Sequence, residues 1–208
     1  MLRLHHSPMA CSLASRFALA ESGLPHEIAV VRTSRGEQKT EAYLRINPRG
    51  KVPALETDWG TLTESSAILP FIADLAPQAL LFPAVGGFER ARGQAWLSFL
   101  SSSLHASLAA AAFPMSGSDT EAAVATARGR VATAFRDVDA HLESRDHLLD
   151  DFSVCDLYLL VFGLWRAAPV FATGLPPLPN LDRFQSKLLA RPKLAAVMGE
   201  EAKLRAEA

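Results

Sequence analysis

The sequence predicts an α/β domain at the N-terminus followed by an all-helical domain at the C-terminus. Three observations lead to this prediction. Strand-like and helix-like segments alternate over residues 1–75, a stretch with two prolines and two glycines follows, and every regular segment beyond it has a helical pattern. The expected division is a first domain over residues 1–76, a linker over 77–87 and an all-helical domain over 88–208.

The first domain begins with a β-α-β unit. Residues 2–5 and 27–31 are short β-type runs, and residues 12–22 between them are helical. Gly23-Leu24-Pro25 ends this helix, because glycine commonly follows a last helical turn and proline cannot continue it. The two strands should therefore be parallel, with a right-handed connection.

A hairpin and a further helix complete the first domain. A polar loop over 33–40 leads into a short helical stretch that ends at Asn47-Pro48-Arg49-Gly50. Residues 52–57 and 61–63 then flank Asp58-Trp59-Gly60, a pattern typical of a β-hairpin. Residues 65–75 form the last predicted helix, so the expected order is β-α-β-α-β-β-α.

The second domain is predicted to be a helical bundle, because no strand pattern occurs beyond the linker. The expected helices are 88–112, 120–142, 154–168, 180–189 and 192–205.

Composition excludes several classes of function. The 208 residues carry a formal net charge of -1, which offers no basic surface for nucleic acid. The N-terminus lacks the pattern of a signal peptide, and no apolar run reaches the roughly 18 residues that cross a bilayer. We therefore expect a cytoplasmic protein without nucleic-acid or membrane partners.

The cysteine and histidine content argues against a disulfide framework or a metal site. The chain has only two cysteines, Cys11 and Cys155, far apart in sequence. His5 and His6 are adjacent but have no third ligand nearby, so no metal is expected.

Cys11 is the first candidate for chemistry. It lies where the first strand passes into the first helix, and backbone N–H groups at a helix start can stabilise a thiolate. The alternative is that Cys11 is a small buried apolar residue. Ala14 stands three residues further on, so no C-x-x-C pair exists and any redox role would use one thiol.

Two further segments could bind a ligand. Val52-Pro53 opens the third strand, where a proline needs an edge or a special turn. Thr63-Glu64-Ser65-Ser66 lies at a strand-to-helix junction, where N–H groups can hold a carboxylate and Glu64 can hold an ammonium group. Helix capping by Thr63 or Glu64 explains the second segment equally well.

His105 and Ser153 are the candidates in the helical domain. His105 shares a polar stripe at helical spacing, as either a solvated histidine or a residue facing a cleft between the domains. Ser153 and Asp156 fit a capping box before an apolar helix, and Cys155 beside them is expected in the core.

Taken together, these segments resemble the glutathione S-transferase superfamily over nearly the whole chain. Ser7-Pro8-Met9-Ala10-Cys11-Ser12-Leu13 is most similar to the bacterial beta class, whose active-site cysteine opens the first helix. The resemblance implies a thioredoxin-like N-terminal domain with an all-helical C-terminal domain, and a homodimer. It also implies that Cys11 faces the sulfur of glutathione and that His105 approaches that sulfur from the second domain.

The resemblance assigns the rest of the glutathione site. Val52, before a cis Pro53, would bind the cysteinyl part through its backbone. Glu64 and Ser65 would hold the γ-glutamyl end, and Arg35 would meet the glycyl carboxylate.

One position departs from the beta class. Where those sequences commonly have a tyrosine near the end of the first strand, this chain has His6, and a one-residue shift would bring His5 to the same place. A tyrosine hydroxyl therefore cannot stabilise the thiolate, and one of the two histidines is expected to line the glutathione site.

The resulting hypothesis is a glutathione transferase, with glutathione as co-substrate and no metal. Cys11, the helix N-terminus and His105 would hold the glutathione thiolate, which attacks a small electrophile in a detoxification reaction. A related version forms a mixed disulfide between Cys11 and glutathione and acts on disulfide substrates. The alternatives are a non-catalytic glutathione-binding or regulatory protein, and a glutathione-dependent isomerase or dehalogenase. The residues expected around the electrophile pocket are Phe113, Met115, Phe162 and Trp165.

Overall fold

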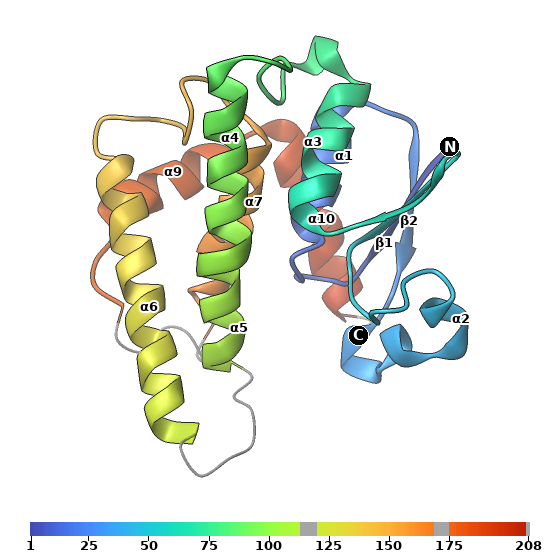
Figure 1. Cartoon of the computed structure of the whole chain (residues 1–208), viewed down its shortest axis with the longest axis horizontal. Helices are drawn as coiled ribbons and strands as arrows, with labels where there is room; N and C mark the ends of the chain where they lie inside the picture. Colours follow the sequence, from blue (N-terminus) through green and yellow to red (C-terminus); the bar gives the residue numbers. More distant parts are fainter. Residues whose placement is uncertain (113–119, 169–174, 207–208) are drawn as a thin grey trace. The chain divides into compact units, whose positions relative to one another are not determined.

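The computed structural model describes residues 1–112, 120–168 and 175–206 (Figure 1). They divide into two compact units, the first comprising Met1–Pro83 with Leu189–Ala208 and the second Ala84–Leu188. Phe113 and Met115, which the sequence places near the electrophile pocket, lie outside the described residues.

A four-stranded sheet forms the centre of the first unit, in the order β2-β1-β3-β4. β1 (Leu2–His6) pairs in parallel with β2 (His26–Val30) and antiparallel with β3 (Ala54–Thr57), and β4 (Gly60–Thr63) completes the hairpin with β3. Parallel pairing of β1 and β2 and the hairpin about Asp58 and Trp59 agree with the sequence prediction.

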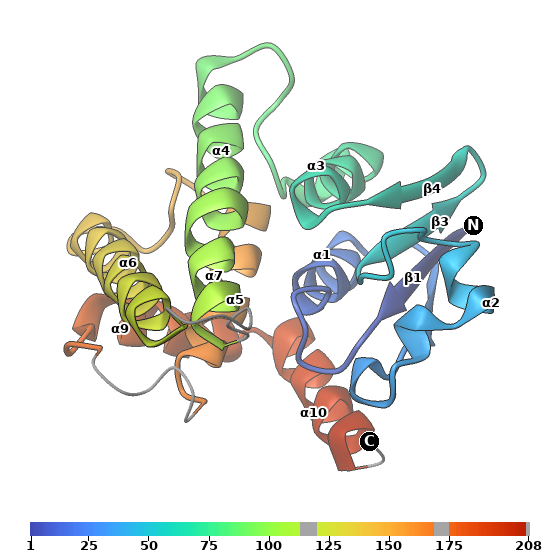
Figure 2. The ribbon, with the colours of Figure 1, turned by 60° about the horizontal axis from the view of Figure 1, so that its bottom comes forward.

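Helices cover the sheet of the first unit. α1 (Leu13–Ser22) and α3 (Ser65–Leu75) pack together on one side, whereas α2 (Glu41–Leu44) lies on the other (Figure 2). Short 3-10 turns η1 (Thr33–Arg35), η2 (Glu37–Lys39) and η3 (Pro77–Ala79) connect these elements. Leu4, Phe17 and Ile68 are fully buried between the sheet and the helices. Gly23 ends α1 with φ 71°, and its N–H donates to the Leu19 carbonyl, which is the stop expected of glycine at this position.

The C-terminal helix belongs to the first unit. α10 (Pro192–Ala206) packs against α1, and Arg191 just before it forms an ion pair with Glu21 at 2.9 Å. The sequence prediction assigned all of residues 88–208 to the helical domain, whereas the structure groups 189–208 with the sheet. α10 belongs to the first unit because it packs against α1. A helical sequence pattern does not reveal contacts between residues so far apart in the chain.

All the regular secondary structure among the described residues of the second unit is helical. α4 (Phe88–Phe99) continues through a π-helical segment, η4 (Leu100–His105), into α5 (Ala106–Ala112), and α5 packs against α6 (Thr120–His141). α7 (Val154–Trp165) is buried from Val154 to Gly163, and α9 (Pro179–Leu189) follows. The single helix predicted over residues 88–112 is thus interrupted by a π segment.

Candidate active site

A tight loop presents Cys11 at the start of α1. The Ala10 N–H donates to the Ser7 carbonyl at 3.0 Å, and the Leu13 N–H donates to the Ala10 carbonyl at 3.0 Å. Met9, which lies between Ser7 and Ala10, has φ 56°, a left-handed conformation that costs free energy for a residue with a Cβ. Such strain is kept only where surrounding contacts enforce it, and it is common around functional sites.

The thiol of Cys11 lies against the backbone of Val52. Its Sγ donates to the Val52 carbonyl at 3.3 Å, and the Val52-Pro53 peptide bond is cis, as the resemblance implied. The structure therefore brings together two segments, at the start of α1 and before β3, that the sequence singled out separately.

Two side chains support the segment before Val52. The Tyr43 hydroxyl and the Asn47 amide both donate to the Lys51 carbonyl, at 2.7 and 2.6 Å. Gly50 makes the preceding turn with φ 61°, where a Cβ would lie 3.1 Å from the backbone oxygen of Gln38. Glycine is therefore favoured at this position, because a Cβ would crowd η2 in a backbone conformation that side chains rarely adopt.

Burial raises the pKa of the Cys11 thiol to about 11, and the Glu64 carboxylate contributes in the same direction. Backbone hydrogen bonds at Cys11 and Ser12 and the Lys51 ammonium lower this pKa, so the expected effect of the helix start is present. The rise in pKa from desolvation is larger than the lowering by these groups. The structure therefore favours a neutral Cys11 thiol that donates to the Val52 carbonyl over the thiolate expected from the helix start.

The start of α3 forms a second part of the site. Glu64 occupies the position before the helix with φ 70°, is exposed, and its side chain makes no capping hydrogen bond. The Arg49 guanidinium lies 3.9 Å from the Glu64 carboxylate and donates to the Thr63 hydroxyl at 3.3 Å. The Glu64 side chain therefore does not cap α3. Ser65 begins the helix and is buried, and first-turn N–H groups of a helix have no partner within it.

Arg35 lies at the end of η1 and is exposed. The η1 turn is attached to the Cys11 loop through Thr33, whose hydroxyl is 2.9 Å from the Ser7 hydroxyl and whose N–H donates to it at 3.4 Å.

His6 does not line an open site. Its ring is fully buried, with Nδ1 2.8 Å from the Ser12 hydroxyl and Nε2 2.7 Å from the Glu201 carboxylate. His5 is also buried, with Nε2 2.5 Å from the Glu56 carboxylate and its ring edge-on to Tyr43. These placements do not support direct contact of either ring with glutathione, because both rings are buried and both His6 nitrogens and the Nε2 of His5 already have partners within the protein.

His105 lies among aromatic rings at the end of the π segment. Its ring centroid is 5.3 Å from that of Phe162 and 5.4 Å from that of Trp165, and Nδ1 is 3.4 Å from the Tyr158 hydroxyl. His105 is therefore not a solvated histidine. Phe162 and Trp165, both predicted around the electrophile pocket, lie together beside it within the second unit.

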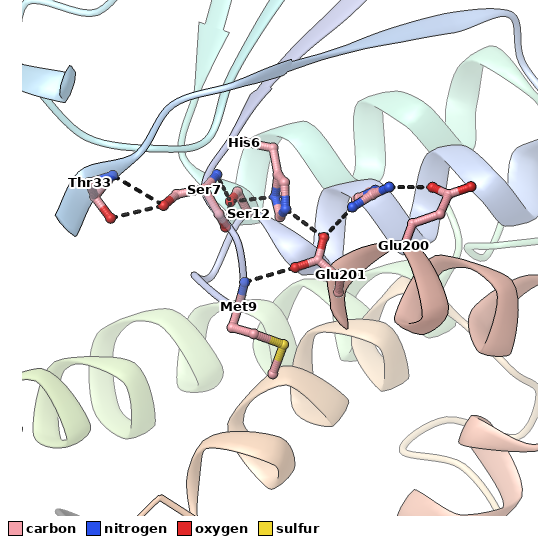
Figure 3. A network of polar contacts seen from close by, with 8 residues as sticks. His6, Ser7, Met9, Ser12, Thr33, Glu200 and Glu201 are labelled. Atoms are coloured by element: carbon pink, nitrogen blue, oxygen red, sulfur yellow. Dashed lines mark hydrogen bonds and ion pairs between the residues drawn. The ribbon is translucent and has the colours of Figure 1, made fainter. Parts of the chain in front are cut away.

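Glu201 (Figure 3) and Arg16 are two charged residues of this region that the sequence reasoning missed. The Glu201 carboxylate is buried and accepts hydrogen bonds from Arg16, from His6 and, at 2.9 Å, from the Met9 N–H. Arg16 also donates to the exposed Glu200 carboxylate. The sequence signal that could have found this network is Arg16 within a mostly apolar helix, because an arginine on a buried helix needs a charged or polar partner.

The part of the chain that the structure describes contains no group of three or more potential metal-ligating side chains. Nor does any helix among those described residues have the length and apolar character to cross a bilayer.

Comparison with known proteins finds similarity along the chain. Residues 8–75 match the family model for the N-terminal domain of glutathione S-transferases. A glutathione S-transferase of Xanthomonas campestris is 34% identical over 209 residues, covering 96% of this chain and 98% of the relative. The structure of a sphingomonad glutathione S-transferase complexed with glutathione matches with a TM-score of 0.85 and 38% identity, over 96% of this chain and 98% of that one. The beta-class enzyme of Sphingomonas chungbukensis matches with a TM-score of 0.84 and 36% identity, over the same shares of the two chains. These matches therefore include both compact units.

Proposed function

The chain belongs to the glutathione S-transferase family, and on this basis we propose that it binds reduced glutathione with the sulfur beside Cys11 and transfers it to small electrophiles. The observation that carries this proposal is the contact between the Cys11 thiol and the Val52 carbonyl at the cis Val52-Pro53 bond. It brings the reactive group and a peptide-binding backbone segment to one place.

Each part of glutathione has a matching group in the first unit. The exposed Glu64 carboxylate suits the ammonium of the γ-glutamyl end, and the N–H groups at the start of α3, by Ser65, suit its carboxylate. The backbone of Val52 pairs with the cysteinyl part, and the Arg35 guanidinium meets the glycyl carboxylate.

Cys11 acts in this proposal as a neutral thiol. With a pKa of about 11 it remains protonated at neutral pH, so its S–H can turn from the Val52 carbonyl to a glutathione thiolate. Bound glutathione releases its thiol proton to solvent, and the donation from Cys11 stabilises the resulting thiolate. The thiolate attacks the electrophilic carbon and forms the new sulfur–carbon bond while the bond to the leaving group breaks, which releases chloride when the substrate is 1-chloro-2,4-dinitrobenzene. His105 is the proposed second donor to the sulfur, from the aromatic cluster with Phe162 and Trp165. A mixed disulfide at Cys11 is disfavoured as the main reaction, because that step requires the thiolate of Cys11.

The wider setting follows the family. The proposal includes a homodimer in the cytoplasm, a detoxification role, and no metal.

Steady-state conjugation of glutathione to a general aromatic electrophile such as 1-chloro-2,4-dinitrobenzene tests the proposal. We expect saturable turnover by the wild type and a loss of about tenfold in kcat for Cys11→Ala, since a lost thiolate donor weakens the transition state. Cys155→Ala is the matched control, because Cys155 is buried against the Gly93 carbonyl in the second unit. Equal activity of Cys11→Ala and wild type would contradict the role of Cys11. Tight glutathione binding without turnover across conjugation, isomerisation, dehalogenation and disulfide assays would favour the non-catalytic alternative.

A further inference from the structure

A buried carboxylate on the C-terminal helix holds the loop that presents Cys11. The Glu201 side chain is 1% exposed, and one of its oxygens accepts the Met9 N–H at 2.9 Å. Its other oxygen accepts hydrogen bonds from Arg16 and from His6 Nε2 at 2.7 Å. The carboxylate therefore joins the loop before Cys11, the first strand and the first helix.

Charged and polar neighbours keep Glu201 ionised inside the protein. The hydrogen bonds from His6 and Met9 and the charge of Arg16 lower its pKa, although burial acts in the opposite direction. Removing one partner of such a buried network leaves the other groups unsatisfied. The network is thus suited to holding one arrangement of the loop.

The conformation of Met9 needs such a restraint. A φ of 56° is unfavourable for methionine, so the loop would relax if its surroundings did not enforce this geometry. His6 transmits a second restraint, because its Nδ1 bonds the Ser12 hydroxyl, which also accepts the Ser7 N–H at 3.2 Å (Figure 3). Both sides of Cys11 are therefore fixed through Glu201, directly at Met9 and through His6 at Ser12.

We infer that Glu201 is a positioning residue of the active site, which holds the loop before Cys11 so that its thiol stays against Val52 and beside the glutathione sulfur. The consequence for glutathione rests on the proposed function, whereas the consequence for the Cys11 thiol does not. The sequence gives no indication of this role, since Glu201 lies 190 residues after Cys11 in a charged helical stretch.

Glu201→Gln is the direct test and Glu200→Gln its matched control. Glutamine keeps the size of Glu201, but an NH2 donor replaces one of the two carboxylate oxygens, and these oxygens separately accept from Met9 and from His6 with Arg16. One of the two sets of hydrogen bonds is therefore lost. Glu200→Gln removes the same charge from the neighbouring residue, which contacts Arg16 from the exposed surface.

Alkylation by iodoacetamide at pH 8, followed by mass spectrometry, gives the reaction rate of each cysteine separately. The assay contains no glutathione. We expect Glu201→Gln to raise the rate at Cys11 at least about tenfold, because a loosened loop exposes the thiol and removes its desolvation. Cys155, fully buried in the second unit, is the internal reference for general unfolding and should react as in the wild type. Glu200→Gln should change either rate less than about twofold, because it leaves the loop restraints intact. An unchanged Cys11 rate, or an equal rise at both cysteines, would overturn the inference.

Two further measurements separate the possible failures. In the wild type, hydrogen exchange should show the Met9 amide protected, and an unprotected amide would overturn the inference even if Glu201→Gln did not fold. In conjugation assays, Glu201→Gln should lower kcat more than it raises KM for glutathione. A wild type that neither binds nor turns over glutathione would refute the proposed function while leaving the alkylation and exchange tests decisive for the loop.

Discussion

The reactivity of Cys11 is predicted to be low at neutral pH and to rise with pH up to about 11. Burial raises its pKa to about 11, against roughly 8.5 for an unperturbed cysteine. At pH 7 about 1 thiol in 10,000 is then ionised, compared with about 3 in 100 for the unperturbed thiol, a deficit of roughly 300-fold. The more basic thiolate is the better nucleophile and recovers roughly tenfold, so the net deficit is about 20- to 30-fold.

Iodoacetamide alkylation of Cys11 between pH 7 and pH 10, compared with a short cysteine peptide, measures this deficit. The rate at Cys11 should increase about tenfold for each pH unit over the whole range, whereas the peptide rate should level off near pH 9. A Cys11 rate that is already level at pH 7 to 8 would refute the reasoning, because it would show a thiolate stabilised by the helix start despite burial.

Three other changes have expected outcomes. Glu64→Gln should raise KM for glutathione about tenfold with a smaller effect on kcat, because it removes the charge proposed to hold the ammonium group; an unchanged KM would place that group elsewhere. Ser153→Ala should lower the free energy of unfolding by about 1 kcal/mol in urea denaturation, because the Ser153 hydroxyl accepts the Cys155 N–H at 3.3 Å at the start of α7. Burial raises the pKa of Asp156 to about 7, so the folded state retains a proton that the unfolded state releases above about pH 4. The wild-type free energy of unfolding minus that of Asp156→Asn should therefore fall as pH rises from about 4 to about 7 and stay level above pH 7. A rise of this difference over the same range would contradict the raised pKa of Asp156.

Local signals in the sequence were sufficient for the fold and for part of the site. The α/β-plus-helical fold class and the interpretation as a glutathione transferase are confirmed by the full-length similarity to glutathione S-transferases. The stop at Gly23 and the capping box of Ser153 and Asp156 occur as predicted, and the cis bond before Pro53 occurs as the resemblance implied. The first two depend on residues close together in the chain, where backbone preferences and short-range hydrogen bonds decide the structure.

Features that depend on distant contacts could not be predicted. Pairing of His6 with Glu201 joins residues 195 positions apart, and it explains why His6 is buried rather than facing a ligand. The pKa of Cys11 depends on desolvation by the folded protein, which no local pattern measures. The surroundings of His105 could not be read from a helical stripe, because η4 winds more residues into each turn than an α-helix and so rotates the residues after Leu100 relative to that stripe.

The most direct test of the central claim is a crystal structure of the protein with reduced glutathione. The account predicts one glutathione per chain in the first unit, with its cysteinyl backbone paired to Val52, its γ-glutamyl end at Glu64 and Ser65, and its sulfur within hydrogen-bond distance of the Cys11 thiol. Glutathione bound away from Val52, or bound there with its sulfur pointing away from Cys11, would contradict the account.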